Sequence, residues 1–527
     1  MERLSMIGFK NLTSLICLTP RGLSFAQSEG GESAFTVDML ARAVGCKKLV
    51  GDKNLEIKTL INDSRRACPK SAFFAVGGAN TDGNLYIEEA THRGAVAIVS
   101  ERPAPEKYYP AAWIQVDSIA DAMAAAAKAF YEKPDENLKF FAVTGTNGKT
   151  SVTWMIQHIQ NALSQKCGLI GTIQYDLGGR CLPASRTTPL ALETFAMLHQ
   201  MRRSRCVSAA IEISSHAIAQ KRVEGLNIDC ACFTNLTQDH IDYHLDMESY
   251  FETKASLFTG ALGSIPKSAA INIDDPKGKI IAERIDPSKT KLITFSIENP
   301  EATISVRDLQ LNAQESKFTL VYPEGQVEIK LKMPGRYNVS NALTAMAALY
   351  SQGTDMKAAA NALNTFRGVP GRMQKVSSNA KFDILIDYAH TDDALKNGLE
   401  MLREVVKGRI LVVFGCGGRR DRTKRPKMTA VVQKYADIAW ATSDNPRGED
   451  INQIFNDMKA GVSDPTKIAF IENRRRAINL AIDAASDGDC ILIAGKGHEA
   501  FQELGDTIIP FDDKRVAEEL LTVKGLA

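Results

Sequence analysis

The sequence predicts an α/β protein of three domains, with mostly parallel, doubly wound sheets in the central and C-terminal parts. The chain has 527 residues, and a domain usually takes about 100–200 residues. Short apolar segments of strand length alternate with segments of helical periodicity, which is the order that produces parallel sheets. No internal repeat or low-complexity tract interrupts this alternation.

The first domain is expected over residues 35–137, where strands and helices alternate. Apolar runs predict its strands, and amphipathic or alanine-rich runs predict its helices. The predicted elements are strands at 71–76 and 94–100 and helices at 86–93 and 117–131.

The central domain is expected over residues 138–367 and the C-terminal domain over residues 368–527. In each, apolar strands are separated by segments long enough for a helix, which indicates parallel pairing. The predicted central elements are strands at 138–143, 209–213, 230–233 and 269–273, helices at 150–163 and 338–351, and β structure at 302–333. The predicted C-terminal strands lie at 382–386, 410–414, 438–441, 468–471 and 489–494.

The composition excludes several classes of protein. The chain is 44% apolar and 24% charged with a formal net charge of +2, so its charge favours neither nucleic acid nor a membrane surface as a partner. No apolar run approaches the roughly 20 residues of a membrane-spanning helix. The ten cysteines form no CxxC pair, and Cys230 and Cys232 stand too close for the usual zinc spacing. We expect reduced thiols in a cytoplasmic enzyme without membrane insertion.

Residues 1–34 form an extension before the first domain. They combine a few positive charges with a short apolar stretch and a polar tail, but Lys10, Asn11, Thr13 and Ser14 break the apolar part. A disordered extension or a misplaced start is the expectation, and a targeting segment is the alternative.

A glycine loop follows the first strand of the central domain. The segment VTGTNGKTS (143–151) ends in Gly-Lys-Thr, as phosphate-binding loops do. The usual loop has a glycine five positions before Gly148, where this chain has Val143, and the nearby upstream glycine is Gly145. The helix that follows would present its N–H groups and positive dipole end to phosphate oxygens. Lys149 would then reach the terminal phosphates and the Thr150 hydroxyl would ligate Mg²⁺; the alternative is a coincidental Gly-Lys-Thr at a helix start.

The shortened loop resembles that of the Mur ligases and their folylpolyglutamate synthetase relatives, which are ATP-dependent enzymes that join an amino acid to a carboxylate. Further segments resemble this family in the same order along most of the chain. They are DSRRA (63–67), TTP (187–189), EISSHAI (212–218), FTNLTQDHIDYH (233–244), YFETK (250–254), NIDD (272–275), GRYNVSNAL (335–343), GR (371–372), DYAHT (387–391), GCGGRRD (415–421), DNPR (444–447) and GKGHE (495–499).

The resemblance implies a fold and a reaction. The domains would be an N-terminal α/β UDP-binding domain, a central P-loop-type ATPase domain and a C-terminal Rossmann-like domain. Within the family the motifs are most similar to those of enzymes that add meso-diaminopimelate to UDP-N-acetylmuramoyl-L-alanyl-D-glutamate (UDP-MurNAc-L-Ala-D-Glu) in peptidoglycan precursor synthesis. ATP would phosphorylate the acceptor carboxylate, and the amine would attack the acyl phosphate, with Mg²⁺ as cofactor. The expected partners are these small molecules and not nucleic acid, and a monomer is expected.

The resemblance assigns the catalysis to Lys149, Glu212, His240 and Lys254. Glu212 ends an apolar strand, where α/β sheets bind ligands, and it would ligate Mg²⁺ together with His240 and Thr150. The lysine that matches Lys254 is carbamylated in the family (N6-carboxylysine), which would supply the anionic group that a cation site needs. The alternatives are a solvated carboxylate at a strand end, a structural histidine and an exposed lysine.

The resemblance also assigns residues to the nucleotide. Those of the glycine loop, the central domain and the C-terminal domain are Gly145, Thr146, Asn147, Gly148, Lys149, Thr150, Ser151, Asn272, Asp275, Asn338, Asn341, Arg372 and Asp387. The position of the last two implies closure of the C-terminal domain over ATP. For the asparagines at 272, 338 and 341 and for Asp275, turn and cap chemistry is the alternative.

The remaining assignments concern the two other substrates. The UDP-MurNAc-dipeptide would be bound by Ser64, Ala79, Asn80, Thr81, Thr187, Thr188, Ser214, Gln220 and Arg222. Arg222 suits a carboxylate because its guanidinium binds two oxygens, although an exposed surface arginine is the alternative. The diaminopimelate site would comprise Arg420, Asp444, Asn445, Pro446, Arg447, Gly495 and Glu499.

The DNPR motif predicts which amino acid is added. Diaminopimelate carries a carboxylate at its far end that lysine lacks, and Arg447 can bind it through two oxygens. Glu499 would take the distal ammonium. We therefore expect L-lysine to be a much poorer substrate; a simple turn with a solvated arginine is the alternative.

Two positions depart from the family pattern: Gln374, where an acidic residue is usual, and Asp392, where proline is common. Neither matches a central catalytic group. A folylpolyglutamate synthetase is disfavoured by the complete first domain with its DSR motif and by DNPR. A non-catalytic assembly or regulatory protein is disfavoured because a scaffold has no need of Lys149, Thr150 and the other catalytic candidates together.

Overall fold

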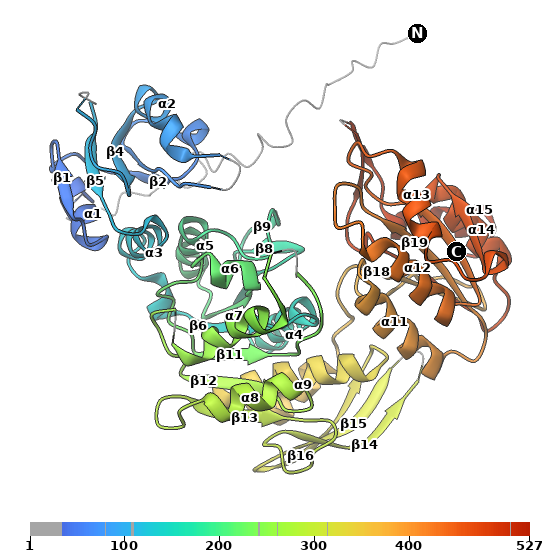
Figure 1. Cartoon of the computed structure of the whole chain (residues 1–527). Coiled ribbons are helices and arrows are strands. Elements are labelled where there is room, and N and C mark those ends of the chain that lie inside the picture. Colours follow the sequence, from blue (N-terminus) through green and yellow to red (C-terminus); the bar gives the residue numbers. More distant parts are fainter. Residues whose placement is uncertain are drawn as a thin grey trace, which may run out of the picture. The chain divides into compact units, whose positions relative to one another are not determined.

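The computed structural model describes residues 34–78, 81–106, 110–240, 243–260, 262–312, 315–505 and 507–527. The predicted extension therefore lies outside the described residues up to position 33, as do Ala79 and Asn80 of the predicted uridine region. Figure 1 shows the helices and strands along the chain. The described residues divide into two compact units. The first contains the described residues up to Pro134 together with Leu190–His199 and Gln220–Gly225, and the second contains the other described residues.

The first unit is built on a five-stranded sheet in the order β1-β5-β4-β3-β2. β1 pairs antiparallel with β5, and the other neighbours are parallel. Phe73, Ile98 and Trp113 belong to its apolar core, together with side chains of α2. The elements are α1 (Val37–Ala43), β1 (Lys48–Val50), β2 (Thr59–Ile61), β3 (Ser71–Phe74), α2 (Ile87–His92), β4 (Ala95–Ser100), β5 (Ala112–Gln115) and α3 (Ile119–Phe130).

The second unit contains an eight-stranded sheet in the order β13-β12-β11-β6-β10-β7-β8-β9. The strands from β13 to β7 are parallel, and β8 and β9 continue the sheet in antiparallel fashion. Later strands flank β6 on both sides, so its carboxyl end is a topological switch point, where such sheets bind ligands. The strands are β6 (Lys139–Thr144), β7 (Cys167–Ile170), β8 (Gln174–Asp176), β9 (Cys181–Pro183), β10 (Ser208–Glu212), β11 (Cys230–Phe233), β12 (Ser268–Asn272) and β13 (Lys291–Phe295).

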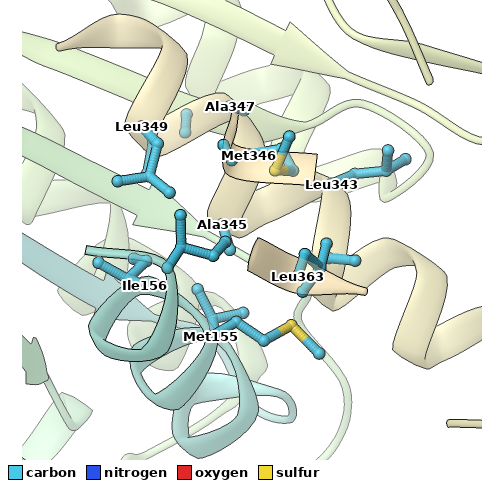
Figure 2. Packing of buried hydrophobic residues seen from close by; sticks show 14 of the residues in the cluster. Met155, Ile156, Leu343, Ala345, Met346, Ala347, Leu349 and Leu363 are labelled. Atoms are coloured by element: carbon cyan, nitrogen blue, oxygen red, sulfur yellow. The ribbon is translucent and has the colours of Figure 1, made fainter. Parts of the chain in front are cut away.

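Helices α4, α9 and α10 pack against one face of this sheet. Phe141 and Val143 of β6 both belong to this core because side chains two residues apart in a strand point to the same face. Figure 2 shows Met155 and Ile156 of α4 among residues of α9 and α10, including Leu363. This burial fixes the start of α4, and with it the glycine loop, against the sheet. The helices of this part are α4 (Lys149–Ala162), α5 (Ala191–Arg203), α6 (Ser215–Ala219), α7 (Met247–Thr259), α8 (Pro276–Arg284), α9 (Arg336–Ser351) and α10 (Met356–Leu363).

A separate antiparallel sheet extends the same core. Its strands are β14 (Ser305–Leu311), β15 (Ser316–Tyr322) and β16 (Gly325–Leu331). Alternate residues such as Phe318 and Leu320 are buried in the core beneath α9, and their neighbours are partly exposed. The period-two pattern of the sequence therefore reflects a sheet with one covered face.

The C-terminal part is a six-stranded sheet in the order β17-β18-β22-β19-β20-β21. β17 is antiparallel to its neighbour, and the other strands are parallel. Successive apolar side chains enter two cores, one against α11, α12 and α13 and one against α14 and α15, so both faces are covered as in a doubly wound sheet. The elements are β17 (Gln374–Lys375), β18 (Asp383–Asp387), α11 (Asp392–Val405), β19 (Ile410–Cys416), α12 (Lys424–Tyr435), β20 (Ile438–Ser443), α13 (Ile451–Lys459), β21 (Ile468–Ile471), α14 (Arg474–Ala484), β22 (Cys490–Ala494), the hairpin β23 (Phe501–Leu504) and β24 (Thr507–Pro510), and α15 (Asp513–Val523).

The predicted α/β class with parallel sheets is confirmed. Each strand and helix predicted from the sequence has a counterpart whose ends differ by at most a few residues; the helix predicted at 117–131, for example, is Ile119–Phe130. Sequence reasoning missed short strands, including β8, β9, β17 and the β23–β24 hairpin. The predicted domain limits near residues 137 and 367 stay predictions.

Two expectations on the whole chain can be compared with the described residues. Within those ranges no helix is long and apolar enough to cross a membrane. The nine cysteines among them are free thiols.

Candidate active site

The glycine loop joins β6 to α4 at the switch point of the central sheet. Gly145 has a φ of 145° and Gly148 a φ of 88°, which are backbone conformations that favour glycine. A Cβ atom on Gly148 would lie 2.2 Å from Oδ1 of Asn341, so this position has no room for a side chain. No side chain in the described part of the chain caps α4, which begins at Lys149 and directs its first N–H groups toward the loop.

A segment that follows β11 holds the loop in shape. The N–H of Thr146 donates to the carbonyl oxygen of Asn235 (2.9 Å), and the N–H of Asn147 donates to Oδ1 of Asn235 (2.9 Å). Oγ1 of Thr234 donates in turn to the carbonyl oxygen of Asn147 (2.6 Å). Residues 234 and 235 therefore hold the short loop through contacts from a second segment.

Two lysines donate to one carbonyl oxygen of this loop. Nζ of Lys149 donates to Gly145 (2.9 Å) and to Thr146 (2.8 Å), and Nζ of Lys254 donates to the same Gly145 oxygen (3.0 Å). Lys254 lies in α7 and is only 1% exposed. The two ammonium groups cannot be farther apart than the two hydrogen bonds laid end to end, about 5.9 Å.

These surroundings lower the pKa of both lysines. Burial lowers the pKa of Lys254 well below its ordinary value, and the charge of Lys149 lowers it further. Burial also lowers the pKa of Lys149, while the carboxylates of Glu212 and Asp239 act in the opposite direction. A lysine with a lowered pKa holds a larger fraction of neutral amine, which is the form that reacts as a nucleophile. Lys254 is therefore not the exposed lysine of the alternative interpretation.

Glu212 ends β10 beside the loop and is 1% exposed. Its carboxylate accepts hydrogen bonds from Oγ1 of Thr150 (3.0 Å) and from the N–H (2.8 Å) and Oγ1 (3.0 Å) of Thr172. A solvated carboxylate at a strand end, the alternative interpretation, does not describe this residue. The Thr150 hydroxyl and the Glu212 carboxylate are adjacent oxygen donors of the kind that Mg²⁺ prefers, so they fit this cation.

Three residues assigned to the dipeptide lie around Glu212. Oγ1 of Thr188 donates to the carbonyl oxygen of Glu212 (2.7 Å) and accepts from the N–H of Ser214 (3.1 Å). The hydroxyls of Thr187 and Thr172 are 3.2 Å apart. The structure thus brings these three residues beside the candidate metal ligands.

His240 has a left-handed backbone, with a φ of 54°. Its Nε2 lies 3.4 Å from Oδ2 of Asp239. Its ring is 4.8 Å from the ring of His216 and 6.2 Å from that of Tyr250, whose hydroxyl lies 3.2 Å from Oγ1 of Thr146 in the loop. No group of three or more histidine, cysteine, aspartate and glutamate side chains suited to a metal occurs among the residues that the structure describes.

The polar residues assigned to the adenosine side make cap and turn contacts, and Asn272 and Asp275 also bind the segment after β11. Asp275 caps α8. Nδ2 of Asn272 and Nδ2 of Asn338 each donate to a backbone carbonyl, at 2.7 and 2.8 Å. The cap and turn alternative therefore describes part of what these three residues do. Asn341 differs, because its Oδ1 lies against Gly148 of the glycine loop.

Residues of the C-terminal part reach the glycine loop. Arg372 donates from Nη2 to Oγ1 of Thr150 (3.4 Å), and its guanidinium carbon lies 4.8 Å from the centre of the Tyr388 ring. Oδ2 of Asp393 accepts from Nδ2 of Asn147 (3.3 Å). Sequence reasoning missed Asp393, which stands next to the position that departs from the family pattern.

Asp387 and the two departing positions have structural contacts. Asp387 accepts from the N–H groups of Met373 (2.7 Å) and Ala389 (2.8 Å), and burial raises its pKa. Oε1 of Gln374 accepts from the N–H of Gly371 (2.9 Å), which supports the turn that carries the neighbouring arginine. Asp392 lies in the first turn of α11, where a negative charge is favourable.

Four of the assigned residues that the structure describes belong to the first compact unit. Ser64 is buried, and its Oγ donates to Oε2 of Glu89 (2.7 Å). Nε and Nη2 of Arg222 donate to Oε1 of Gln220 (3.0 and 2.6 Å). The carbonyl oxygen of Thr81 accepts from a nearby backbone N–H (2.9 Å).

The C-terminal sheet brings DNPR and GKGHE together at the carboxyl ends of parallel strands. Nδ2 of Asn445 donates to Oε2 of Glu499 (2.9 Å). Gly495 has a φ of 112°, and a Cβ atom there would lie 2.8 Å from Oδ2 of Asp444, so glycine allows the close approach of the two loops. Arg420 is exposed in the loop after β19.

Two charged residues outside the assigned set complete this region. Lys496 is fully buried, and its Nζ donates to Oε2 of Glu499 (2.8 Å) and Oδ1 of Asn445 (3.0 Å). Oε2 of Glu503 in β23 lies 3.0 Å from Nε of Arg447. The sequence offered a signal for Lys496, which stands inside GKGHE, and none for Glu503.

Comparisons with known proteins agree on one family. Three models of this family match the chain: the model of the catalytic domain at residues 56–131, that of the middle domain at 143–349 and that of the glutamate ligase domain at 371–497. Relatives named UDP-N-acetylmuramoyl-L-alanyl-D-glutamate--2,6-diaminopimelate ligase occur in Geobacillus thermodenitrificans (42% identical over 88% of this chain and 94% of the relative) and Gloeobacter violaceus (40% identical over 89% and 94%). A solved structure of the same name is 32% identical with a TM-score of 0.63 and covers 89% of this chain and 96% of its own. A UDP-N-acetylmuramoylalanyl-D-glutamyl-2,6-diaminopimelate--D-alanyl-D-alanyl ligase from Acinetobacter baumannii shares the fold at 18% identity, with a TM-score of 0.63 over 89% and 97% of the two chains.

A glycine loop at the switch point of a parallel sheet, with a buried carboxylate beside its threonine, defines a P-loop-type nucleotide-binding protein. The three matched segments, all described by Mur ligase models, cover most of the chain. The chain belongs to the Mur ligase family, which confirms the resemblance drawn from the motifs.

Proposed function

We propose that the chain is an ATP-dependent ligase that adds meso-diaminopimelate to UDP-MurNAc-L-Ala-D-Glu through an acyl phosphate. The observation that carries this proposal is the arrangement at the head of α4, where Thr150 donates to the buried carboxylate of Glu212 (3.0 Å) next to Lys149. Relatives that match nearly the whole chain at 40–42% identity are named for this reaction.

In the first step the acceptor carboxylate attacks the γ-phosphorus of ATP, and ADP leaves. The N–H groups at the start of α4 and the Lys149 ammonium would neutralise the phosphate oxygens, and Arg372 would add a positive charge from the C-terminal part. Thr150, Glu212 and His240 would hold Mg²⁺, which neutralises phosphate charge when it is bound.

The proposal includes a carbamate on Lys254. The ammonium group would first lose one proton, and the neutral amine would then attack the carbon of CO₂, forming a nitrogen–carbon bond and losing a second proton. With two protons released in all, the charge at this buried position would change from +1 to −1, which suits a site where Lys149 and a divalent cation meet. The support is the 1% exposure of Lys254 and the lowered pKa that its burial causes.

In the second step the amine of diaminopimelate attacks the acyl carbon, and the tetrahedral intermediate collapses to the amide and phosphate. Arg447 would bind the distal carboxylate of the amino acid, and Glu499 its distal ammonium. The other residues of this site would be Arg420, Asp444, Asn445, Pro446 and Gly495. The contact between Asn445 and Glu499 supports this assignment, because it joins the two motifs into one binding surface.

The proposal extends to the organisation of the chain. Residues 35–137 would bind the UDP-sugar, residues 138–367 ATP and residues 368–527 the amino acid. The protein would act as a monomer in the cytoplasm.

An assay of ADP release tests the function. With ATP, Mg²⁺ and UDP-MurNAc-L-Ala-D-Glu present, ADP should appear only when meso-diaminopimelate is added, and one amide should form for each ADP. A folylpolyglutamate synthetase would instead release ADP with a folate and glutamate, and a non-catalytic protein would release none with either pair. Either result would overturn the proposal.

A further inference from the structure

A buried arginine connects the two loops that carry Arg420 and Arg447. Arg425, in the first turn of α12, is fully buried. Its Nη1 and Nη2 donate to Oε1 and Oε2 of Glu449, both at 2.8 Å, which is the bidentate geometry of a strong arginine–carboxylate pair. Nη2 also donates to the carbonyl oxygen of Gly417 (3.2 Å) in the loop after β19.

Glu449 continues this connection to both loops. Its Oε2 accepts from the backbone N–H of Arg419 (2.8 Å), and its own N–H donates to the carbonyl oxygen of Pro446 (2.9 Å). The N–H of Gly418 donates to the carbonyl oxygen of Asn445 (2.9 Å). The loop at 415–421 and the loop at 444–449 are therefore joined by one ion pair and by backbone hydrogen bonds.

The loops at 415–421 and 444–449 approach each other so closely that a small shift of one loop would displace the other. A Cβ atom on Gly418 would lie 1.8 Å from the carbonyl oxygen of Pro446, and a Cβ atom on Gly417 would lie 2.9 Å from Nη1 of Arg447. Arg447 itself has a φ of 51°, in the left-handed region that non-glycine residues rarely adopt. Such a backbone persists where its surroundings hold it. The N–H of Arg447 donates to the carbonyl oxygen of Glu503 (3.3 Å), and Glu449, which pairs with Arg425, donates to the carbonyl oxygen of the preceding Pro446 (2.9 Å).

The connection does not titrate in the physiological range. Nη1 of Arg425 also donates to Oδ2 of Asp457 (2.8 Å), so two carboxylates share one guanidinium. The hydrogen bonds from Arg425 lower the pKa of Glu449 to about 2. The pair therefore keeps its charges at any pH where the ligase would work.

We propose that Arg425 and Glu449 are positioning residues for the amino-acid substrate. They touch neither the substrate nor the reacting atoms, and they hold the loops of Arg420 and Arg447 in the register that binds the distal end of the amino acid. This inference rests on the proposed function, because it takes Arg447 as the residue that binds the distal carboxylate.

Two variants test the pair. Glu449→Gln keeps the shape of the side chain and removes its charge, and Arg425→Lys keeps the charge and removes the two-pronged geometry. In both, the KM for meso-diaminopimelate should rise at least tenfold, and the preference over L-lysine should fall at least tenfold. The KM values for ATP and UDP-MurNAc-L-Ala-D-Glu should stay within twofold, and kcat at saturating diaminopimelate within threefold.

A matched control separates this role from general stability. Arg475 pairs with Glu519 (2.7 Å) at the exposed surface of the same C-terminal part, so Arg475→Lys should leave all three KM values unchanged. A Glu449→Asp variant should give a KM for diaminopimelate between those of the parent and Glu449→Gln. If Glu449→Gln lowers kcat but leaves the three KM values unchanged, or does not fold, the pair serves stability alone and the inference fails.

The Arg447→Ala variant distinguishes failure of this inference from failure of the proposed function. If Arg447→Ala leaves the diaminopimelate KM and the preference over lysine unchanged, the site assignment of the proposed function is wrong. If Arg447→Ala raises that KM while Arg425→Lys and Glu449→Gln do not, the site assignment holds and the positioning role is wrong.

Discussion

Replacing Lys254 tests the proposed carbamate, and the structure sets the size of the effect. The ammonium groups of Lys149 and Lys254 are at most about 5.9 Å apart, because both donate to the Gly145 carbonyl oxygen. At an effective dielectric constant of about 20, two like charges at that separation repel by roughly 3 kcal/mol. A carbamate turns this repulsion into an attraction of similar size. Loss of about 3 kcal/mol of support for the phosphate-binding lysine corresponds to roughly a hundredfold loss of rate.

The assay is ADP release at saturating concentrations of all three substrates. Lys254→Ala should lose at least roughly a hundredfold in kcat by the same conversion, and added formate or acetate should restore part of it by occupying the vacated space. Lys254→Arg keeps a positive charge and cannot form a carbamate, so it should be inactive and not rescued. Lys267→Ala is the control, because its ammonium pairs with Asp229 and its side chain is 72% exposed; it should match the parent.

The carbamate also predicts a dependence on CO₂. Because burial lowers the pKa of Lys254, a larger fraction of its side chain is neutral amine than in an ordinary lysine, and activity should fall in CO₂-depleted buffer and return with bicarbonate. Lys254→Ala activity within threefold of the parent would refute the reasoning. A bare ammonium in a high-resolution map of the ligand-bound enzyme would also refute it.

Four further outcomes are expected. Lys149→Ala should abolish ligation without changing the melting temperature, since its ammonium contacts loop carbonyls and not the core; unchanged turnover would exclude the nucleotide assignment. Arg447→Ala should erase most of the discrimination between diaminopimelate and L-lysine, measured as the ratio of their kcat/KM values, and an undiminished ratio would contradict its role. Asp513→Ala should lower the free energy of unfolding, measured with urea, by about 3–5 kcal/mol, because it leaves the fully buried Arg474 without its carboxylate partner. Arg474 donates two hydrogen bonds to Asp513, both 2.7 Å long. The pKa of Glu449 is lowered from 4.5 to about 2, so its carboxylate stabilises the fold above pH 4.5 and loses this effect as the pH falls through about 2. The difference in free energy of unfolding between the parent and Glu449→Gln should therefore shrink over that pH interval, and a constant difference would argue against the ion pair.

The sequence predicted those features that local patterns and matched motifs determine. The alternation of apolar strands and helical segments placed β6, β10 and β11, and the Gly-Lys-Thr sequence placed the start of α4, because these features depend on neighbouring residues. The burial of Lys254 was expected only through the resemblance, since a lysine in a helix is ordinarily exposed.

The sequence could not predict contacts between distant segments. Thr172 reaches Glu212 across 40 positions and Asp393 reaches Asn147 across 246, and neither residue lies in a pattern that marks it. Arg425 follows the GCGGRRD motif and Glu449 follows the DNPR motif, yet neither sequence pattern indicates that the two side chains form an ion pair. Such contacts depend on which strands become neighbours in the sheet, and a single sequence leaves that open.

The bracing of the glycine loop by Thr234 and Asn235 has a consequence for protein engineering. In an ordinary phosphate-binding loop, one continuous peptide contains most of the residues that determine the conformation of the loop. Here the shape is shared between two peptides, and Asn341 from a third segment closes the remaining space. Grafting VTGTNGKTS alone onto another strand and helix should therefore give a turn without a fixed conformation. A graft that also carries residues 233–237 on a strand parallel to the first should keep the conformation of the loop.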